Sequence, residues 1–385
     1  MGLGCTYKAR ASVGNCKPIP AHARVTARRF EERTIKSIDF DRCAVVGYKD
    51  DTGIGRQCHN IKRVLGIRRH LVAPSTRLPG YPICAPNEQV LSHSASIQEL
   101  TLLLSDLDAL FVIERNKWHP NLFKLAKELG LALFLIPNWE WFDSSDGAYA
   151  LVDRFIVHSK FALRFMQAKG FPNTSRVDVP IDLSLLPART VTSLPTLFLH
   201  NAGIIDSTDR KGTLLTIAAW ARKKPSDASL VVRFQKSDIP LPNICGMHNI
   251  AFERMNTPNV GDLYEVGDFA IQPSRLEGLG FMIFEPLLCG IPTLVADAPP
   301  MNELKSGTVF CQGMYSMTQS IPVTRGIGLA QLFDINIDNL ACLIEQLEAT
   351  NVQTLSLSAL EFRKRHSPSV IRREWLALRE GTQLL

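Results

Sequence analysis

The sequence predicts an α/β protein with two domains, each built around a parallel β-sheet. Short apolar runs with strand character alternate with helical segments along most of the 385 residues, and this alternation is typical of parallel sheets covered by helices on both faces. A chain of this length also exceeds the roughly 250–300 residues at which a single hydrophobic core stops growing. Two cores are therefore expected.

The composition is that of an ordinary globular protein, with 45% hydrophobic and 21% charged residues. No apolar run approaches the roughly 20 residues needed to span a bilayer, so we expect a cytoplasmic protein whose contact with a membrane, if any, is peripheral. Nine cysteines are scattered without a CxxC pair, which favours neither a disulfide framework nor a zinc site.

Residues 1–40 are predicted to form a separate basic arm. Eight lysines and arginines face three acidic residues there, and apolar periodicity is poor. The first six residues, Met1 to Thr6, also fit the pattern for N-myristoylation.

The first domain is expected to cover residues 41–186. The apolar strand Cys43 to Tyr48 is followed by a turn with Gly53 and Gly55 and by a helix from Gln57 to Leu65, which is the opening of a Rossmann-like unit. Asp50 and Asp51 read as an exposed turn. Further elements are expected in the order strand 106–114, helix 120–129, strand 131–136, strand 152–159 and helix 160–169, with 177–182 closing the domain.

The second domain is expected to cover residues 187–367, after a boundary marked by Pro187, Ser193 and Pro195. It repeats the strand and helix pattern from Leu197, and a second strand, Phe269 to Gln272, leads through a glycine loop into a helix from Phe281 to Gly290. A last helix within 368–385 is expected to cross back and complete the first domain.

Glu277 and Glu285 lie in this loop and helix, with seven residues between them. Carboxylates accept hydrogen bonds from hydroxyls, which a sugar or a ribose offers in a fixed arrangement. The amides of the glycine loop and of the helix start can face phosphates. The pair therefore indicates a nucleotide-sugar site, the alternative being two solvated surface carboxylates.

The segment resembles the signature of family 4 glycosyltransferases, which have the GT-B fold of two Rossmann-like domains facing a central cleft. Glu277, Gly280 and Glu285 match the family's glutamate motif, and the flanking segments 259–274 and 290–303 are also similar to it. Asp209-Arg210-Lys211-Gly212 resembles the family's phosphate-contacting element. The resemblance covers most of residues 150–350.

The resemblance implies a role for each matching residue. Glu277 would bind sugar hydroxyls, Glu285 the donor ribose and Lys211 the diphosphate. The amides of Gly280 and Phe281 would lie near the sugar phosphate. The glycine loops at Gly203, Gly53 and Gly55 are also implied to lie near the donor.

Two positions depart from the family pattern. The family usually has an arginine directly after the glycine that is Gly203 here, and this chain has Ile204 at that position. Either Arg210 or Arg233 could replace the missing charge. Pro137 and Asn138 stand where the family often has a histidine that contacts the transferring sugar, so that contact falls to Asn138 or Glu140. Two roles are open for Trp139 and Trp141: their side chains either stack on a ligand or pack in the core.

The resemblance implies a retaining, hexosyltransferase-like enzyme that uses a UDP- or GDP-sugar as co-substrate, with no other cofactor. No metal ion is expected, since the resemblance implies none. The basic arm and a series of cations in the first domain favour an anionic acceptor or surface; the series comprises Arg56, Lys62, Arg63, Arg68 and Arg69. A glycan or membrane lipid is the first candidate, and DNA with a hydroxylated base is the second. A protein that binds nucleotide sugars without catalysis is the alternative of another class.

Overall fold

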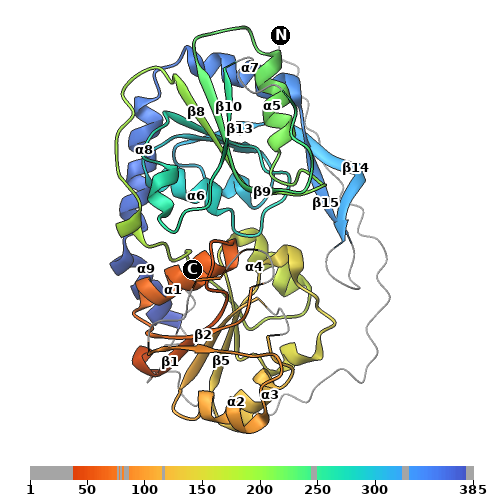
Figure 1. The fold of residues 1–385 in the computed structure, drawn as a ribbon, viewed down its shortest axis with the longest axis vertical. Helices are drawn as coiled ribbons and strands as arrows, with labels where there is room; N and C mark the ends of the chain where they lie inside the picture. The colour runs from red at the N-terminus through yellow and green to blue at the C-terminus, as the bar shows by residue number, and fades with distance from the viewer. Residues whose placement is uncertain are drawn as a thin grey trace, which may run out of the picture.

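The computed structural model describes residues 38–75, 78, 80–81, 86–114, 118–243, 249–322 and 329–378. Within these ranges the chain forms two α/β domains that lie one above the other (Figure 1). The predicted basic arm and the myristoylation pattern lie outside the described residues, except for the last three positions of the arm. Two of these, Ile38 and Phe40, are buried in the core of the N-terminal domain.

The N-terminal domain contains a seven-stranded parallel sheet with the strand order β3-β2-β1-β4-β5-β6-β7. The strands are β1 (Cys43–Gly47), β2 (Arg69–Val72), β3 (Glu88–Val90), β4 (Ala109–Ile113), β5 (Ala132–Ile136), β6 (Arg154–Val157) and β7 (Thr174–Arg176). Every residue of β1 and β4 is buried. Alternate residues of β1 belong to two core clusters on opposite faces of the sheet, which explains why these strands read as continuous apolar runs.

The C-terminal domain contains a six-stranded parallel sheet with the order β10-β9-β8-β11-β12-β13. The strands are β8 (Leu197–Ile205), β9 (Ser229–Ser237), β10 (Ile250–Arg254), β11 (Phe269–Gln272), β12 (Thr293–Ala296) and β13 (Thr308–Cys311). In each sheet the strand order reverses beside the first strand of the domain, which is β1 in one sheet and β8 in the other. Such a switch point leaves a crevice at the carboxyl ends of the strands.

The helices are α1 (Gly53–Leu65), α2 (Ile97–Leu104), α3 (Leu122–Glu128), α4 (Lys160–Ala168), α5 (Thr213–Arg222), α6 (Phe281–Leu288), α7 (Ile337–Glu348), α8 (Gln353–Arg365) and α9 (Pro368–Ala377). Local signals set their ends: the Thr52 side chain accepts a hydrogen bond from the amide of Gly55 to cap α1, and Gly66 ends that helix in the left-handed conformation. None of the helices in the described ranges is long and apolar enough to cross a bilayer.

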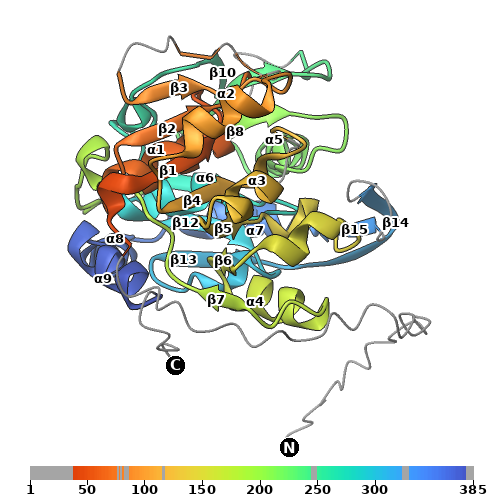
Figure 2. The ribbon, with the colours of Figure 1, turned by 90° about the horizontal axis from the view of Figure 1, so that it is seen from below.

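The chain crosses between the domains twice, and the two crossings lie side by side. The first is the segment before β8, and the second joins α8 to α9, which packs against α1 (Figures 1 and 2). The Arg363 guanidinium of α8 donates to the carbonyls of Leu183 and Leu186 in the first crossing, at 3.1 Å each. The indole of Trp375 in α9 donates to the carbonyl of Asp178 at 3.2 Å.

An antiparallel hairpin, β14 (Gly313–Pro322) and β15 (Leu329–Ile335), stands apart from both parallel sheets. Figure 2 shows it at the side of the molecule. Leu332 of this hairpin is buried in a core cluster of the N-terminal domain. The sequence analysis did not identify the hairpin.

Three local predictions need correction. Gly53 and Gly55 are the first and third residues of α1 rather than a turn before it. Asp50 and Asp51 are buried instead of exposed, because Asp50 accepts hydrogen bonds from Thr52 and Asp51 accepts one from the Tyr81 hydroxyl. The N-terminal sheet closes with β7, and the segment 177–182 that follows it is not a strand.

Candidate functional site

A cavity of about 580 Å³ lies between the two domains, at the carboxyl ends of both parallel sheets. Its volume is within the range of about 300–1,000 Å³ that is usual for small-molecule sites. The N-terminal wall includes Tyr48 after β1, Glu114 after β4 and Asn138 after β5. The C-terminal wall is formed by the end of β8, by the loop that ends at Lys211 and by the start of α6.

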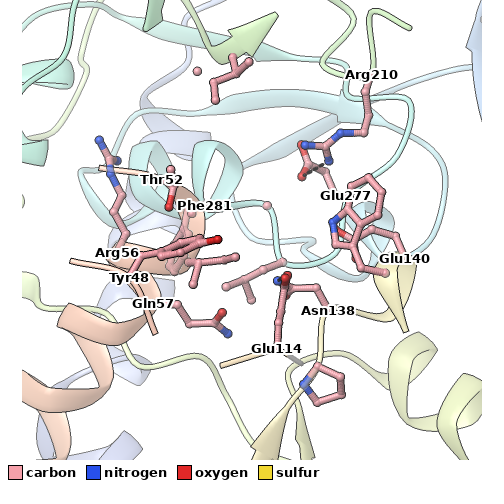
Figure 3. A pocket seen from close by; sticks show the side chains of 18 of the residues that line it. Tyr48, Thr52, Arg56, Gln57, Glu114, Asn138, Glu140, Arg210, Glu277 and Phe281 are labelled. Atoms are coloured by element: carbon pink, nitrogen blue, oxygen red, sulfur yellow. Dashed lines mark hydrogen bonds and ion pairs between the residues drawn. The ribbon is translucent and has the colours of Figure 1, made fainter. Parts of the chain in front are cut away.

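Lys211, Arg210 and Glu277 form a charged cluster on the C-terminal wall. Figure 3 shows Arg210 beside Glu277. The Lys211 Nζ lies 2.6 Å from Glu277 Oε1, and Arg210 Nη1 lies 3.5 Å from Glu277 Oε2 and donates to the Leu276 carbonyl at 3.0 Å. Burial alone would raise the pKa of Glu277, but the charges of Lys211 and Arg210 outweigh it and lower that pKa. Burial lowers the pKa of Lys211, and Glu277 opposes this. The Glu277 carboxylate therefore holds both cations in place.

The start of α6 completes this wall. Gly280 is the N-cap of α6 and has a φ of +79°, a conformation that glycine adopts without strain. Gly280, Phe281 and Met282 all line the cavity, so the N-terminal end of α6 lies at the cavity, where the amides of a first helical turn can face an anion. The start of α5 is different, because the Asp209 side chain already accepts from the amides of Thr213 and Leu214.

Glu140, Asn138 and Glu114 belong to the N-terminal wall, and Glu140 lies beside Glu277 (Figure 3). The Asn138 side-chain amide donates to Glu114 Oε1. Glu140 is 5% exposed, and burial raises its pKa to about 7, with Glu114 and Glu277 adding to the rise and Arg210 opposing it. A Cβ at Gly278 would overlap the Glu140 carboxylate. This carboxyl therefore fits only because position 278 is glycine.

Glu285 is held by partners from both domains. Arg56 Nη1 of α1 donates to Glu285 Oε1 at 3.0 Å and to Oε2 at 3.2 Å, and the Tyr264 hydroxyl donates to Oε2 at 2.8 Å. Burial raises the pKa of Glu285, and Arg56 and Tyr264 oppose that rise. Arg56 lines the cavity, whereas Glu285 lies behind it.

The structure brings nine of the twelve predicted site residues to the cavity wall. They are Gly53, Asn138, Glu140, Gly203, Arg210, Lys211, Glu277, Gly280 and Phe281. Ile204, at the position of the expected arginine, also lines the cavity. Of the two tryptophans left open, Trp141 lines the cavity, and Trp139 packs edge-on against Phe161.

The other three predicted residues, Arg233, Gly55 and Glu285, do not line the cavity. Arg233 on β9 is buried and bonded to Glu253 and to the Leu263 carbonyl, so of the two candidates for the missing arginine only Arg210 faces the cavity. Gly55 lies against the backbone of Asp50, where a Cβ would not fit.

The predicted series of cations on the first domain is not an unopposed basic surface. Each of the five lies in an ion pair: Arg56 with Glu285, Lys62 with Glu88, Arg63 with Asp182, Arg68 with Asp41 and Arg69 with Asp106. The pattern of cations in the sequence could not show these partners, which come from distant segments.

Four residues that shape the site were not among the site residues predicted from the sequence. Glu114 has a φ of +53°, which is uncommon for a residue with a side chain; its place directly after a buried strand was the available signal. Arg56 and Tyr264 hold Glu285, and the Trp139 indole donates to the Glu277 carbonyl at 2.8 Å. These contacts join segments far apart in the chain, so no local pattern could have identified them.

Among the described residues, no group of three or more histidine, cysteine or carboxylate side chains could hold a metal ion. The cavity thus offers cations, carboxylates, aromatic rings and a helix start for binding a ligand.

No family model and no curated protein matches the sequence. Solved structures do match it. The chain is similar to the sucrose-phosphate synthase of Thermosynechococcus elongatus, with a TM-score of 0.57 and 13% identity over 88% of this chain and 97% of that one. It is similar to the lipopolysaccharide outer core galactosyltransferase WaaB, with a TM-score of 0.57 and 13% identity over 86% and 97% of the two chains.

A third similar structure is WaaG, a glycosyltransferase involved in lipopolysaccharide biosynthesis, with a TM-score of 0.55 and 12% identity over 88% of this chain and all of that one. The match to TarM spans only 55% of that chain, at a TM-score of 0.53. Identities this low show the fold and no more. The chain therefore has the GT-B fold, which confirms the predicted arrangement of two Rossmann-like domains around a central cleft.

Proposed function

We propose that the protein is a retaining glycosyltransferase of the family 4 type, which transfers a sugar from a nucleotide-sugar donor to a hydroxyl acceptor. The observation that carries the proposal is the cluster of Lys211, Arg210 and Glu277 beside the start of α6, in the cleft of a GT-B fold. Cations beside a helix start suit a diphosphate. A carboxylate next to them suits sugar hydroxyls.

The donor diphosphate would lie against Lys211, Arg210 and the first turn of α6. It would take over part of the charge pairing that Glu277 now provides, and would leave the Glu277 oxygens for sugar hydroxyls. Arg210 lines the cavity and supplies the guanidinium that the family carries at the position of Ile204. Because these groups are in place before reaction, they stabilise the charge that develops on the leaving diphosphate.

In the transfer step the bond from the anomeric carbon to the diphosphate oxygen breaks, and a bond to the acceptor oxygen forms on the same face of the sugar. The acceptor proton passes to an oxygen of the departing phosphate. No protein nucleophile and no metal takes part, so the protein contributes positioning and charge.

A uridine or guanosine diphosphate sugar is the proposed donor. One of the similar structures, an α,α-trehalose-phosphate synthase from Burkholderia xenovorans, is described as UDP-forming; it has a TM-score of 0.58 and 9% identity over 88% of this chain and all of that one. We propose that the donor ribose lies beside Arg56. Glu285 would then either bind the ribose hydroxyls directly, once its ion pair with Arg56 opens, or hold Arg56 in position.

The first test is a thermal-shift screen of the full chain against UDP-, GDP-, ADP- and CMP-sugars. A ligand that binds only the folded state stabilises it by about 2.7 kcal/mol at a concentration of 100 times its Kd. A rise in Tm with one nucleotide class supports the proposal. No rise with any donor contradicts it.

The second test asks whether the site turns the donor over. The double variant Lys211→Met with Glu277→Gln removes the Lys211–Glu277 pair and leaves Arg210 its contacts with Asp206 and the Leu276 carbonyl. It should lower kcat for transfer or donor hydrolysis by about 10²–10³-fold. Lys236→Met, an exposed lysine outside the cavity, is the matched control. Donor binding without turnover in both wild type and variant would instead favour a non-catalytic nucleotide-sugar-binding protein.

A further inference from the structure

Two contacts join the N-terminal domain to the segments that follow β11 and β12. The Trp139 indole, after β5, donates to the main-chain carbonyl of Glu277 at 2.8 Å. The Glu303 carboxylate, after β12, accepts from the amides of Lys160 and Phe161 at 2.8 and 2.6 Å. These amides open α4, and Figure 1 shows α4 at the boundary between the domains. Each contact therefore requires the two domains to be docked against each other.

Phe161 connects the two contacts. Its amide donates to Glu303, and its ring packs edge-on against Trp139, with 4.8 Å between the ring centroids. Phe165, one turn further along α4, also packs against Trp139, at 5.6 Å. Because the indole is buried between domains and packed against both rings, it has little freedom to turn. The position of α4 therefore sets the position of the indole N–H.

The Glu303 carboxylate suits the start of α4. The amides of a first helical turn have no partner within the helix, and the helix dipole favours a negative charge there. Ser159 caps this turn from within the N-terminal domain by accepting from the Ala162 amide, and Glu303 takes the amides of Lys160 and Phe161 from the other domain. Since Glu303 is only partly buried, its carboxylate can return to water when the domains separate.

Glu277 is held from both domains. Its side chain pairs with Lys211 and Arg210 on the C-terminal wall, whereas its main chain is bound by Trp139 of the N-terminal domain. Two of the three residues that follow Glu277 are glycines, which restrict the backbone little. A contact from outside the loop therefore has a large effect on where the Glu277 carboxylate lies.

We propose that Trp139 and Glu303 are positioning residues for Glu277. Glu303 holds the start of α4, α4 holds the indole of Trp139, and the indole fixes the main chain of Glu277 when the domains close. This inference rests on the proposed function and adds that the N-terminal domain completes the subsite for the donor sugar. The diphosphate depends less on closure, because Lys211 and Arg210 belong to the C-terminal domain alone.

The first measurement follows hydrogen exchange at the tryptophan indoles of the full chain by NMR, without a ligand. Trp139→Phe identifies the Trp139 signal among the five indoles. Glu303→Ala should speed exchange at the Trp139 indole by about tenfold, because its bond to Glu277 opens more often. Trp220, which is buried in the C-terminal core, should keep its wild-type rate. An unchanged rate at Trp139, or an equal rise at Trp220, would overturn the inference.

Glu345→Ala is the matched control. The Glu345 carboxylate accepts from the amide of Lys224 at 2.8 Å, which is the same kind of contact made within the C-terminal domain. Exchange at the Trp139 indole should stay as in wild type. A rise equal to that in Glu303→Ala would show a general loosening of the chain and would also count against the inference.

The second measurement asks whether the contact acts on the sugar subsite. Trp139→Phe keeps an aromatic ring against α4 and removes the indole N–H. The probes are UDP-glucose with UDP and GDP-mannose with GDP, titrated against the full chain. For the pair that binds, the variant should raise the Kd of the sugar nucleotide about tenfold and that of the nucleoside diphosphate less than about twofold. A purely structural role would weaken both alike, and that result would overturn the inference.

Failure of the proposed function is a separate outcome. It shows as binding of neither pair to the wild-type chain, and the exchange rates, which need no ligand, then decide the inference alone.

Discussion

The two walls of the cavity differ in how their charges are compensated. On the C-terminal wall, Lys211 and Arg210 are neutralised by Glu277 of the same domain. Among the described residues that line the N-terminal wall, Arg56 is the one lysine or arginine, and it is paired with Glu285 of the other domain. The cations of one wall are thus balanced within their own domain, whereas the cation of the other wall links the two domains.

Removing Arg56 should break this comparison most strongly, because the ion pair that joins the N-terminal wall to Glu285 would be lost. Glu285 is 2% exposed and would keep only the hydrogen bond from Tyr264. We expect Arg56→Met to lower the free energy of unfolding by about 3–5 kcal/mol, measured by urea denaturation.

The double variant Arg56→Met with Glu285→Met is the control, since it leaves no buried charge without a partner. It should recover most of the lost stability. If the single and double variants unfold at the same urea concentration, the pair contributes through packing and not through charge.

Glu140 sharpens the comparison through its response to pH. Its pKa is raised from an ordinary value near 4.5 to about 7 in the folded state, so between these pH values the folded state binds more protons than the unfolded one. The free energy of unfolding should therefore fall as pH rises through this window, by about 3 kcal/mol from this group. In Glu140→Gln this part of the decline should be absent.

The measurement is the free energy of unfolding of wild type and Glu140→Gln at several pH values between 4 and 8. Glu361→Gln, which removes an exposed carboxylate outside the cavity, should follow the wild-type profile. Parallel profiles for wild type and Glu140→Gln would show that Glu140 is ionised in the folded state across the whole window.

The smallest expected effect concerns the contact between the two walls at Gly278. A Cβ there would overlap the Glu140 carboxylate, so Gly278→Ala should cost about 1–3 kcal/mol in unfolding free energy. Gly53→Ala is the matched control, because a Cβ at that position in α1 meets nothing within 4 Å. An equal loss in the two alanine variants would contradict the proposed contact.

Most of the fold could be predicted from the sequence because buried parallel strands are short apolar runs. β11 was predicted with its observed bounds, Phe269–Gln272. Gly53 and Gly55 were placed before α1 since glycine usually marks a turn, yet the Thr52 cap begins the helix at Gly53. The hairpin β14–β15 directly follows β13 of the C-terminal sheet. Its residues show no pattern that was recognised as an antiparallel hairpin outside that sheet.

A site residue could be predicted where it belongs to a local sequence motif. It could not be predicted where its role depends on a contact with a distant segment. Lys211 and Glu277 were found from local motifs, and the structure brings them within 2.6 Å. Arg56 was assigned to a basic surface because its partner, Glu285, is 229 residues away. Glu114 was read only as the end of a strand, since nothing local shows that its carboxylate meets Asn138.

The paired crossings between the domains limit how the cleft can open. Arg363 and Trp375 bind the segment before β8 to the helices α8 and α9 of the second connection. We therefore expect the domains to hinge about an axis through both connections, rather than to rotate freely about a single linker. A proteolytic cut in one connection would leave the halves attached through the other.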